Sequence, residues 1–244
     1  MSTNLTSGSQ PLATELDRPL YTPIKRRSFF MYAGATAGAT ALVLAGCKDN
    51  SDNPGMVSLG TGDAGVLNYA YALEQLEAAF YTQLRTGSYY LGTATVPATA
   101  AEKAILDDLY YHEVIHRDFF KAAITAAGAT PIKGLTPNFS SVDFSSRTSV
   151  LGTAKAFEDL GVAAYNGAGQ YITNPNYLFI AGKIVSVEAR HAAVIRDLVT
   201  EGNFVGSDIL NSSSLEISKA PNDVVTTANA FLADGSKLAS PGTF

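Results

Sequence analysis

The sequence has no tryptophan, one cysteine and only three histidines in 244 residues. A single cysteine excludes an intrachain disulfide framework and any metal site built on four cysteines. Charged residues make up 16% of the chain, and the formal net charge of −5 argues against a nucleic-acid partner. Alternating β-branched runs are scarce and alanine is frequent, which favours an all-α fold. The hydrophobic fraction of 46% is sufficient for one sizeable core with a small appendage.

The segment 1–47 has the features of an export signal. The stretch RRSFF at 26–30 resembles the twin-arginine signal of exported bacterial proteins, and an uncharged stretch follows it up to residue 46. The next residue is the only cysteine, and the sequence LAGC that ends at Cys47 resembles a lipoprotein processing box. We therefore expect Cys47 to be the lipidated first residue of an acidic mature protein, on the periplasmic side of the membrane or at the cell surface. An uncleaved membrane anchor is the alternative, because the uncharged stretch approaches a bilayer span in length.

The remaining chain divides into a tether, a helical bundle and a C-terminal extension. Residues 48–62 are polar and rich in glycine, which predicts a flexible tether. Apolar residues at helical spacing then predict a bundle within 63–201, with helices at about 63–85, 98–127, 149–172 and 175–201. The connection 128–147 holds two prolines, two glycines and several serines, so it is a long crossover between the second and third helices.

Local signals mark the helix ends. We expect Asp63 to cap the first helix, and Gly128 to end the second. Asn174 before Pro175 is a good N-cap and first-turn pair for the fourth helix. In the extension, 202–244, the sequence Pro-Asn-Asp from residue 221 predicts a short fifth helix that ends near residue 233.

Two of the three histidines belong to a repeated Glu-x-x-His motif, with Glu113 and His116 in one copy and Glu188 and His191 in the other. Residues three apart share one face of a helix, so each motif presents a carboxylate beside an imidazole. Apolar residues flank both motifs at helical spacing. On the apolar face of the fourth helix we predict that Glu188 and His191 are the only interruptions.

The first and third helices also repeat one pattern. One face of the first helix carries Leu67, Ala70, Glu74, Glu77, Tyr81 and Leu84. The same face of the third carries Leu151, Ala154, Glu158, Gly161, Tyr165 and Ala168. The two stripes align residue for residue, which pairs Glu74 with Glu158 but Glu77 with Gly161. Glu74 is therefore the better candidate for a ligand, and Glu77 is a candidate for an additional or outer carboxylate.

Four carboxylates on apolar helix faces need partners, because burying an unpaired carboxylate costs several kcal/mol. The chain offers too few lysines and arginines on the same faces to pair them all. Two divalent cations balance four carboxylates, and a bundle in which each helix contributes a glutamate is a known framework for two metal ions. Oxygen and nitrogen ligands without thiolates suit iron or manganese, although zinc or copper also bind them.

These segments resemble the ferritin-like superfamily, and more narrowly the ferritin-like and desiccation-related domain proteins of bacteria. The resemblance covers about residues 63–201 and the C-terminal helix. It rests on LNYAYALEQLEAAFY (67–81), HEVIH (112–116), FEDLGVAAYNGA (157–168) and VEARHAAVIRDL (187–198). It implies a ferritin-like four-helix bundle with one long crossover and a short C-terminal fifth helix.

The resemblance also implies a two-metal site with Glu113 and Glu188 as bridging ligands. The full set of implied ligands is Glu74, Glu113, His116, Glu158, Glu188 and His191. Tyr81 and Tyr165 lie where such proteins place a tyrosine near the metals, as an electron donor or a hydrogen-bond partner, and core packing explains them equally well. Many relatives have an aspartate immediately before the ligand glutamate, where this sequence has His112 and Val187. The surroundings of the metals are therefore expected to differ.

The sequence HEVIH also matches the H-E-x-x-H motif of zinc proteases, in which His112 and His116 bind one zinc ion. That interpretation needs a third ligand and an edge strand for the substrate, and no strand is predicted nearby. It also leaves Glu74, Glu158 and the second Glu-x-x-His motif without a role. We therefore expect His112 to be a hydrogen-bonded neighbour of the metal site, with a role as an additional ligand as the alternative.

The sequence predicts an exported, lipid-anchored protein whose two iron or manganese ions act on O2, peroxide or ferrous iron. A lipid at Cys47 conflicts with assembly into a closed soluble cage for mineral storage. Peroxide reduction would need an external electron donor, because a four-cysteine iron domain is absent from the sequence, whereas catalase-like dismutation needs none. The expected partners are the lipid bilayer and a small-molecule substrate, with a homo-oligomer left open. The alternative is a non-catalytic scaffold for surface assembly or desiccation protection, with a metal-stabilised or empty site.

Overall fold

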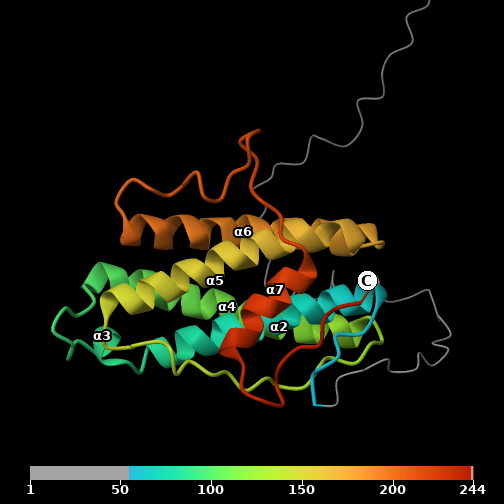
Figure 1. The fold of residues 1–244 in the computed structure, drawn as a ribbon, viewed down its shortest axis with the longest axis horizontal. Helices are drawn as coiled ribbons and strands as arrows, with labels where there is room; N and C mark the ends of the chain where they lie inside the picture. The colour runs from blue at the N-terminus through green and yellow to red at the C-terminus, as the bar shows by residue number, and fades with distance from the viewer. Residues whose placement is uncertain (1–54, 243) are drawn as a thin grey trace, which may run out of the picture. The chain divides into compact units, whose positions relative to one another are not determined.

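A computed structural model describes residues 55–242 and 244 of the chain. The predicted export segment, with Cys47, and residues 48–54 of the tether lie outside the described residues. The elements in order are α2 (Gly62–Leu84), α3 (Ser88–Leu91), α4 (Ala100–Ala126), α5 (Arg147–Ala168), η1 (Gly169–Tyr171), α6 (Pro175–Val199), α7 (Pro221–Ala228) and η2 (Asn229–Phe231). The described chain has no strand, only isolated β-bridges, so the predicted all-α class is confirmed (Figure 1). No described helix combines the length and apolarity that a bilayer crossing requires.

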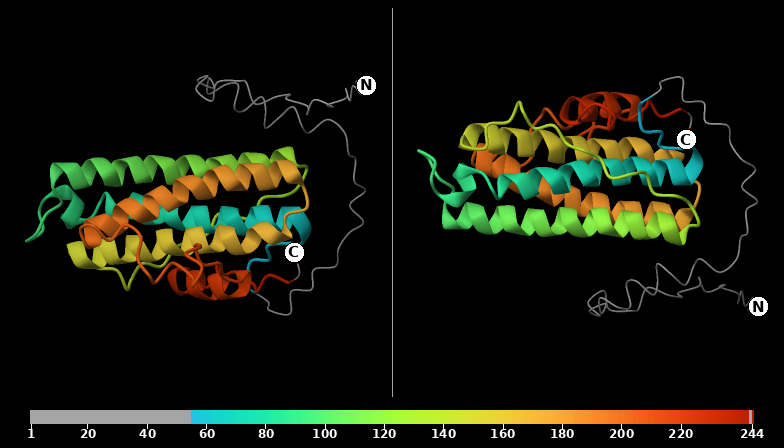
Figure 2. Two further views of the ribbon diagram at one scale, coloured as in Figure 1. Left: turned by 90° about the horizontal axis from the view of Figure 1, so that it is seen from above. Right: turned by 90° about the horizontal axis from the view of Figure 1, so that it is seen from below.

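The four long helices form a bundle of two pairs. α2 packs against α4, and α5 packs against α6, while the segment 127–146 crosses from the first pair to the second. Contacts between α2 and α5 and between α4 and α6 close the bundle (Figure 2). The predicted four-helix bundle with one long crossover is confirmed.

Local sequence sets several helix ends, and those at Asn174 and Gly128 were predicted. Asn174 caps α6, and Pro175 is the first residue of that helix. Gly128 follows the end of α4 with a φ of 75°, a left-handed conformation that glycine adopts without steric cost. α4 begins with a capping box, in which Thr99 Oγ1 accepts from the Glu102 N–H at 3.1 Å and the Glu102 carboxylate accepts from the Thr99 N–H at 2.8 Å.

The prediction that Asp63 caps α2 is wrong. Thr61 occupies the N-cap position without a side-chain cap, and Asp63 lies in the first turn. Its carboxylate accepts hydrogen bonds from the backbone N–H groups of Thr173 and Asn174 at 2.7 and 3.0 Å. Asp63 therefore joins the start of α2 to the loop before α6, because these distant N–H groups compete successfully for its oxygens.

Two side-chain amides on α2 hold the crossover. Asn68 donates to the carbonyl of Thr130 at 3.3 Å and accepts from the N–H of Ile132 at 3.0 Å. Gln75 accepts from the N–H of Leu135 at 2.9 Å. These bonds satisfy crossover backbone that has no helical partner. The crossover covers the outer side of α2, so this helix is buried around most of its circumference instead of along one stripe.

The C-terminal extension belongs to the same hydrophobic core. α7 packs against α5, on the side of the bundle away from α4 (Figure 2). Val224 and Leu238 are buried in the main core cluster. Val57 forms a β-bridge with Leu238, and Leu59 is also buried. The described end of the predicted tether is therefore packed against the bundle rather than loose.

One glycine shows how closely the extension approaches α5. Gly167 is buried, and a Cβ at this position would collide with the backbone carbonyl of Lys219, whose N–H donates to the carbonyl of Ala163 at 3.0 Å. We expect Gly167→Ala to destabilise the protein by about 1–3 kcal/mol, because backbone must move to relieve the overlap. Thermal unfolding measures this loss.

The matched control is Gly152→Ala on the same helix. A Cβ at this exposed position meets no atom within 4 Å. This substitution should stabilise the protein by about 0.5–1 kcal/mol, because alanine favours the helix more than glycine does. A melting temperature for Gly167→Ala that equals or exceeds that of the native chain would show that the extension is not seated on α5.

Candidate metal centre

Each long helix directs one fully buried glutamate to the middle of the bundle, from α2, α4, α5 and α6 in turn. The Glu-x-x-His motifs of α4 and α6 add two imidazoles at the same level. The structure thus brings together all six predicted residues. They form two overlapping groups that could each hold a metal ion, which we call site A (Glu74, Glu113, His116 and Glu188) and site B (Glu113, Glu158, Glu188 and His191).

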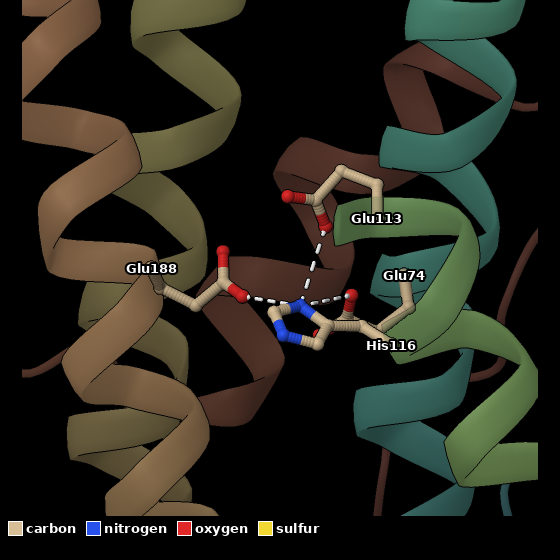
Figure 3. Close-up of side chains that lie close together, drawn as sticks. All are labelled: Glu74, Glu113, His116 and Glu188. Carbon is tan, nitrogen blue, oxygen red and sulfur yellow. Dashed lines mark ion pairs between the residues drawn. The ribbon is translucent and has the colours of Figure 1, made fainter. Parts of the chain in front are cut away.

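In site A the imidazole of His116 lies among three carboxylates (Figure 3). Its Nδ1 is 2.7 Å from Glu188 Oε1, 3.5 Å from Glu74 Oε2 and 3.7 Å from Glu113 Oε2. In Figure 3, α2 and α4 present Glu74, Glu113 and His116 from one side, and α6 presents Glu188 from the other.

Site B repeats this arrangement around His191. Its Nδ1 is 2.8 Å from Glu113 Oε1, 3.5 Å from Glu158 Oε2 and 3.5 Å from Glu188 Oε2. Glu113 and Glu188 therefore present one oxygen to each site. Each histidine makes its shortest contact with the glutamate of the other Glu-x-x-His helix, so α4 and α6 are joined through the cluster.

The geometry and the donor atoms fit bound metal ions. Metal–ligand bonds of about 2.0–2.2 Å place neighbouring ligand atoms about 3 Å apart, which agrees with the spacing in both sites. Eight buried atoms have no hydrogen-bond partner outside the cluster and form ion-pair contacts only with one another, and they are Nδ1 of both histidines, both oxygens of Glu113 and Glu188, and Oε2 of Glu74 and Glu158. Such groups are costly to bury unless a cation or proton compensates them.

The two predicted tyrosines hold the remaining carboxylate oxygens. Tyr81 of α2 donates to Glu158 Oε1 of α5 at 2.5 Å, and Tyr165 of α5 donates to Glu74 Oε1 of α2 at 2.5 Å. Burial and then the adjacent glutamate raise the pKa of both phenols, so both remain protonated donors. Each bond fixes one oxygen of its glutamate and leaves the other directed at a site.

Burial and charge crowding oppose the ionised state of the carboxylates. Burial and then the neighbouring Glu188 raise the pKa of Glu113. Burial by itself lowers the pKa of His116 and His191, but close contacts with the carboxylates raise both above the ordinary histidine value. Contacts with these histidines also lower the pKa of Glu188 to about 2, although burial acts in the other direction. The metal-free protein therefore carries protons where cations would bind.

Glu77, predicted as an additional carboxylate, belongs to neither site. Its carboxylate faces Gly161, since a Cβ built on that glycine would lie 3.0 Å from Glu77 Oε1. The repeat pairs these two positions, and the glycine of one helix leaves room for the glutamate of the other. Burial, followed by repulsion from Glu113 and Glu74, raises the pKa of Glu77 well above its ordinary value. Among the described residues it has no hydrogen bond or ion pair.

We expect Glu77→Gln to raise the melting temperature of the metal-free protein by several degrees at pH 8. Each unit by which burial raises the pKa costs about 1.4 kcal/mol once the carboxylate ionises, and the amide removes this cost. The folded-state pKa is raised, so the benefit should vanish as the pH falls below 4.5, where Glu77 is protonated in the unfolded chain as well. Differential scanning calorimetry at several pH values measures the effect.

Glu102→Gln is a control in which the expected change in melting temperature has the opposite sign. Glu102 is also buried, but Arg147 Nε donates to it at 2.7 Å and its capping hydrogen bonds lower its pKa although burial acts to raise it. Its amide variant should lose stability at pH 8. A lower melting temperature for both variants would show that Glu77 is stabilised as an anion.

His112, predicted as a hydrogen-bonded neighbour or an additional ligand, lies beside site B without joining either group. Its Nδ1 is 2.8 Å from Nε2 of His191, and the two rings stack with centroids 5.0 Å apart. This arrangement differs from that of a zinc protease, because His112 and His116 do not share a site and Glu113 faces both sites. The described chain also has no strand to hold a peptide substrate.

The prediction that Glu188 and His191 alone interrupt the apolar face of α6 is wrong. Arg196 is also buried, and it pairs with Asp159 of α5 at 2.7 Å and with Asp208 of the following loop. Lys155 contacts the same two aspartates at 2.9 and 3.3 Å. The spacing of Arg196 from His191 gave no sign of burial, because its aspartate partners come from α5 and a loop without regular structure.

Comparison with known families agrees with this architecture. A sequence model of the ferritin-like domain matches residues 62–201, which include the four long helices and both sites. The match covers more than half of the chain, and the protein belongs to the ferritin-like family. The predicted resemblance to the ferritin-like superfamily is thereby confirmed. Comparison with curated proteins finds no match.

Proposed function

We propose that this protein is an exported, lipid-anchored member of the ferritin-like family whose bundle holds two iron or manganese ions and acts on O2, peroxide or ferrous iron. The observation that carries the proposal is the set of eight buried oxygen and nitrogen atoms that have no hydrogen-bond partner outside the cluster and face one another in two sites. Four carboxylates balance two divalent cations, and carboxylate with imidazole suits iron and manganese.

The contacts of each glutamate support a distinct role. Glu113 and Glu188 present one oxygen to each site and are suited to bridge two ions. Glu74 and Glu158 each have one oxygen held by a tyrosine and are suited to bind one ion each. Bound iron or manganese supplies a Lewis acid and a redox couple for oxygen chemistry. Loading requires His116 and His191 to release their protons, so metal affinity should fall at acid pH.

Site A is the better candidate for contact with substrate. The side chain of His116 is 13% exposed, whereas that of His191 is 4% exposed. This difference supports approach of a small molecule from the side of His116. Tyr81 and Tyr165 are oxidisable side chains bonded directly to candidate ligands, and we assign them as electron donors to the centre as well as positioning groups.

Metal analysis followed by turnover assays tests this function. The full chain should bind about two iron or manganese ions, consume O2 with ferrous iron or decompose peroxide, and lose these activities in Glu188→Ala/His191→Ala. Exposed residues of the same helix provide the control variant Lys183→Ala/Arg190→Ala, which should behave like the native chain. Bound metal without turnover would contradict the catalytic role and favour a protective or structural scaffold.

Export and anchoring are tested separately. Cys47→Ser should move the protein from the membrane fraction to the soluble fraction, because the proposed lipid attaches to this thiol. Arg26→Lys/Arg27→Lys should retain the chain in the cytoplasm, because the twin-arginine pair is the proposed export signal. Fractionation with immunoblotting measures both outcomes. A Cys47→Ser chain that stays in the membrane would contradict lipidation and support the uncleaved anchor.

A further inference from the structure

The candidate metal centre has an approximate two-fold repeat. α2 corresponds to α5 and α4 to α6, which pairs Glu74 with Glu158, Glu113 with Glu188, and His116 with His191. The tyrosine bonds and the shortest histidine contacts follow the same repeat. The repeat is broken next to the ligands, because His112 precedes Glu113 on α4 whereas Val187 precedes Glu188 on α6.

Because of this difference, His191 alone of the two has a histidine within hydrogen-bond distance of its ring among the described residues. Nδ1 of His191 faces the carboxylates of site B, and its Nε2 lies 2.8 Å from Nδ1 of His112. When Nδ1 of a neutral imidazole binds a cation, the proton must be on Nε2. His191 then donates its Nε2–H to Nδ1 of His112, which accepts. Stacking of the two rings, with 28° between their planes, further restricts the orientation of His191.

His116 has no equivalent support. Its Nδ1 faces site A, but no residue in the described chain forms a hydrogen bond with its Nε2. The position that corresponds to His112 is Val187, whose side chain has no acceptor. The side chain of His116 is also more exposed than that of His191, at 13% against 4%. The ring of His116 can therefore lose more rotational freedom on binding a cation than that of His191, and no described protein group raises its basicity by accepting from Nε2.

We propose that His112 is a positioning residue that makes the two metal positions unequal, with site B the tighter and site A the exchangeable position. This inference rests on the proposed binding of two metal ions and adds the order in which they load. A hydrogen-bond partner on a ligand histidine is typically worth about 10–100-fold in metal affinity. The first ion therefore occupies site B, and the second enters site A, the position of the more exposed histidine.

Titration of the metal-free full chain with Mn²⁺ tests the inference, with calorimetry for affinity and electron paramagnetic resonance for the state of the bound ion. The native chain should bind two ions in two affinity classes. The spectrum of the first equivalent should be that of an isolated Mn²⁺, and the second should convert it to that of a coupled pair. His116→Ala should keep the tight class, and His191→Ala should keep only the weak one.

Variants at the two unequal positions identify the cause. His112→Val, which copies Val187, should weaken the tight class by about 10–100-fold and leave the weak class nearly unchanged. His112→Asn should retain most of the affinity, because its side-chain oxygen can accept the same bond. Val187→His should strengthen the weak class by supplying an acceptor for His116. Ile115→Ala, at a residue of α4 that is 59% exposed, is the control and should change neither class.

The outcomes separate this inference from the proposed function. Two Mn²⁺ ions bound with a single affinity, or an equal loss in both classes for His112→Val, would overturn the inference and leave the two-metal site in place. The same loss for His112→Asn as for His112→Val would show that the imidazole packs against His191 without accepting its hydrogen bond. A native chain that binds neither manganese nor iron would overturn both proposals.

Discussion

The double variant Glu188→Ala/His191→Ala is expected to lose most of the stabilisation that metal gives to the native chain. Glu188 contributes an oxygen to each site and His191 contributes the nitrogen of site B, so the variant cannot complete either group. One ion present at about a thousand times its dissociation constant stabilises a folded protein by about 4 kcal/mol. For a chain of this size that corresponds to a shift of about 10 °C in melting temperature.

Thermal unfolding with metal and with chelator measures this loss. In chelator the variant should melt within a few degrees of the native chain, because it loses packing but also loses a buried carboxylate from a crowded cluster. The exposed double variant Lys183→Ala/Arg190→Ala should keep the full metal response. An equal fall in melting temperature in both conditions would show that Glu188 and His191 serve packing alone.

The metal-free and metal-loaded proteins are expected to respond to pH in opposite directions between about pH 5 and 8. In the metal-free protein the pKa values of Glu77, Glu113, His116 and His191 are all raised in the folded state. A group with a raised folded-state pKa stabilises the fold when it is protonated. This contribution to the free energy of unfolding is lost as the pH rises through the folded-state pKa. Metal binding needs the same ligands deprotonated, so it strengthens with pH.

The pH windows follow from the ordinary values of these groups. The glutamate contribution is complete below pH 4.5 and the histidine contribution below pH 6.5, and both decline above those values. Glu188 acts in the opposite sense, because its lowered pKa gives stability that is lost only as the pH falls from 4.5 towards about 2. The metal-free protein should therefore melt highest in mild acid.

Chemical denaturation at pH 5 and pH 8, with chelator and with excess Mn²⁺, measures both trends. The stability difference between the two metal conditions should be several kcal/mol larger at pH 8 than at pH 5. The variant Glu188→Ala/His191→Ala should show little difference between metal and chelator at either pH. A metal-free native chain that gains stability from pH 5 to pH 8 would contradict protonated histidines at the centre of the bundle.

The sequence was sufficient to predict the fold class and the residues that meet at the centre. Two Glu-x-x-His motifs and two aligned stripes place their polar residues on one face of each helix, because a helix repeats every 3.6 residues. Four buried carboxylates need compensation for their charge, and they obtain it when they meet around shared cations or protons. The repeat even favoured Glu74 over Glu77, and only Glu74 lies within a site.

Interactions between segments distant in sequence were not predicted. Asp63 has the residue type of a helix cap but binds the loop before α6, which lies about 110 residues away. In the sequence Arg196 resembles an exposed charged residue, but in the structure it pairs with Asp159 of α5 and Asp208 of a loop. Periodicity describes one helix at a time, so it carries no information on which partners another segment will supply.

The sequence by itself determined that this protein is an all-α bundle with six candidate metal ligands on four helix faces, since helical spacing and the cost of buried charge depend on local order and composition. Only the tertiary structure decided how those side chains are supported. It placed Tyr81 against Glu158, Tyr165 against Glu74, and His112 against His191. These contacts cross between helices, and a hydrogen bond needs an approach of about 3 Å that only the packed bundle fixes.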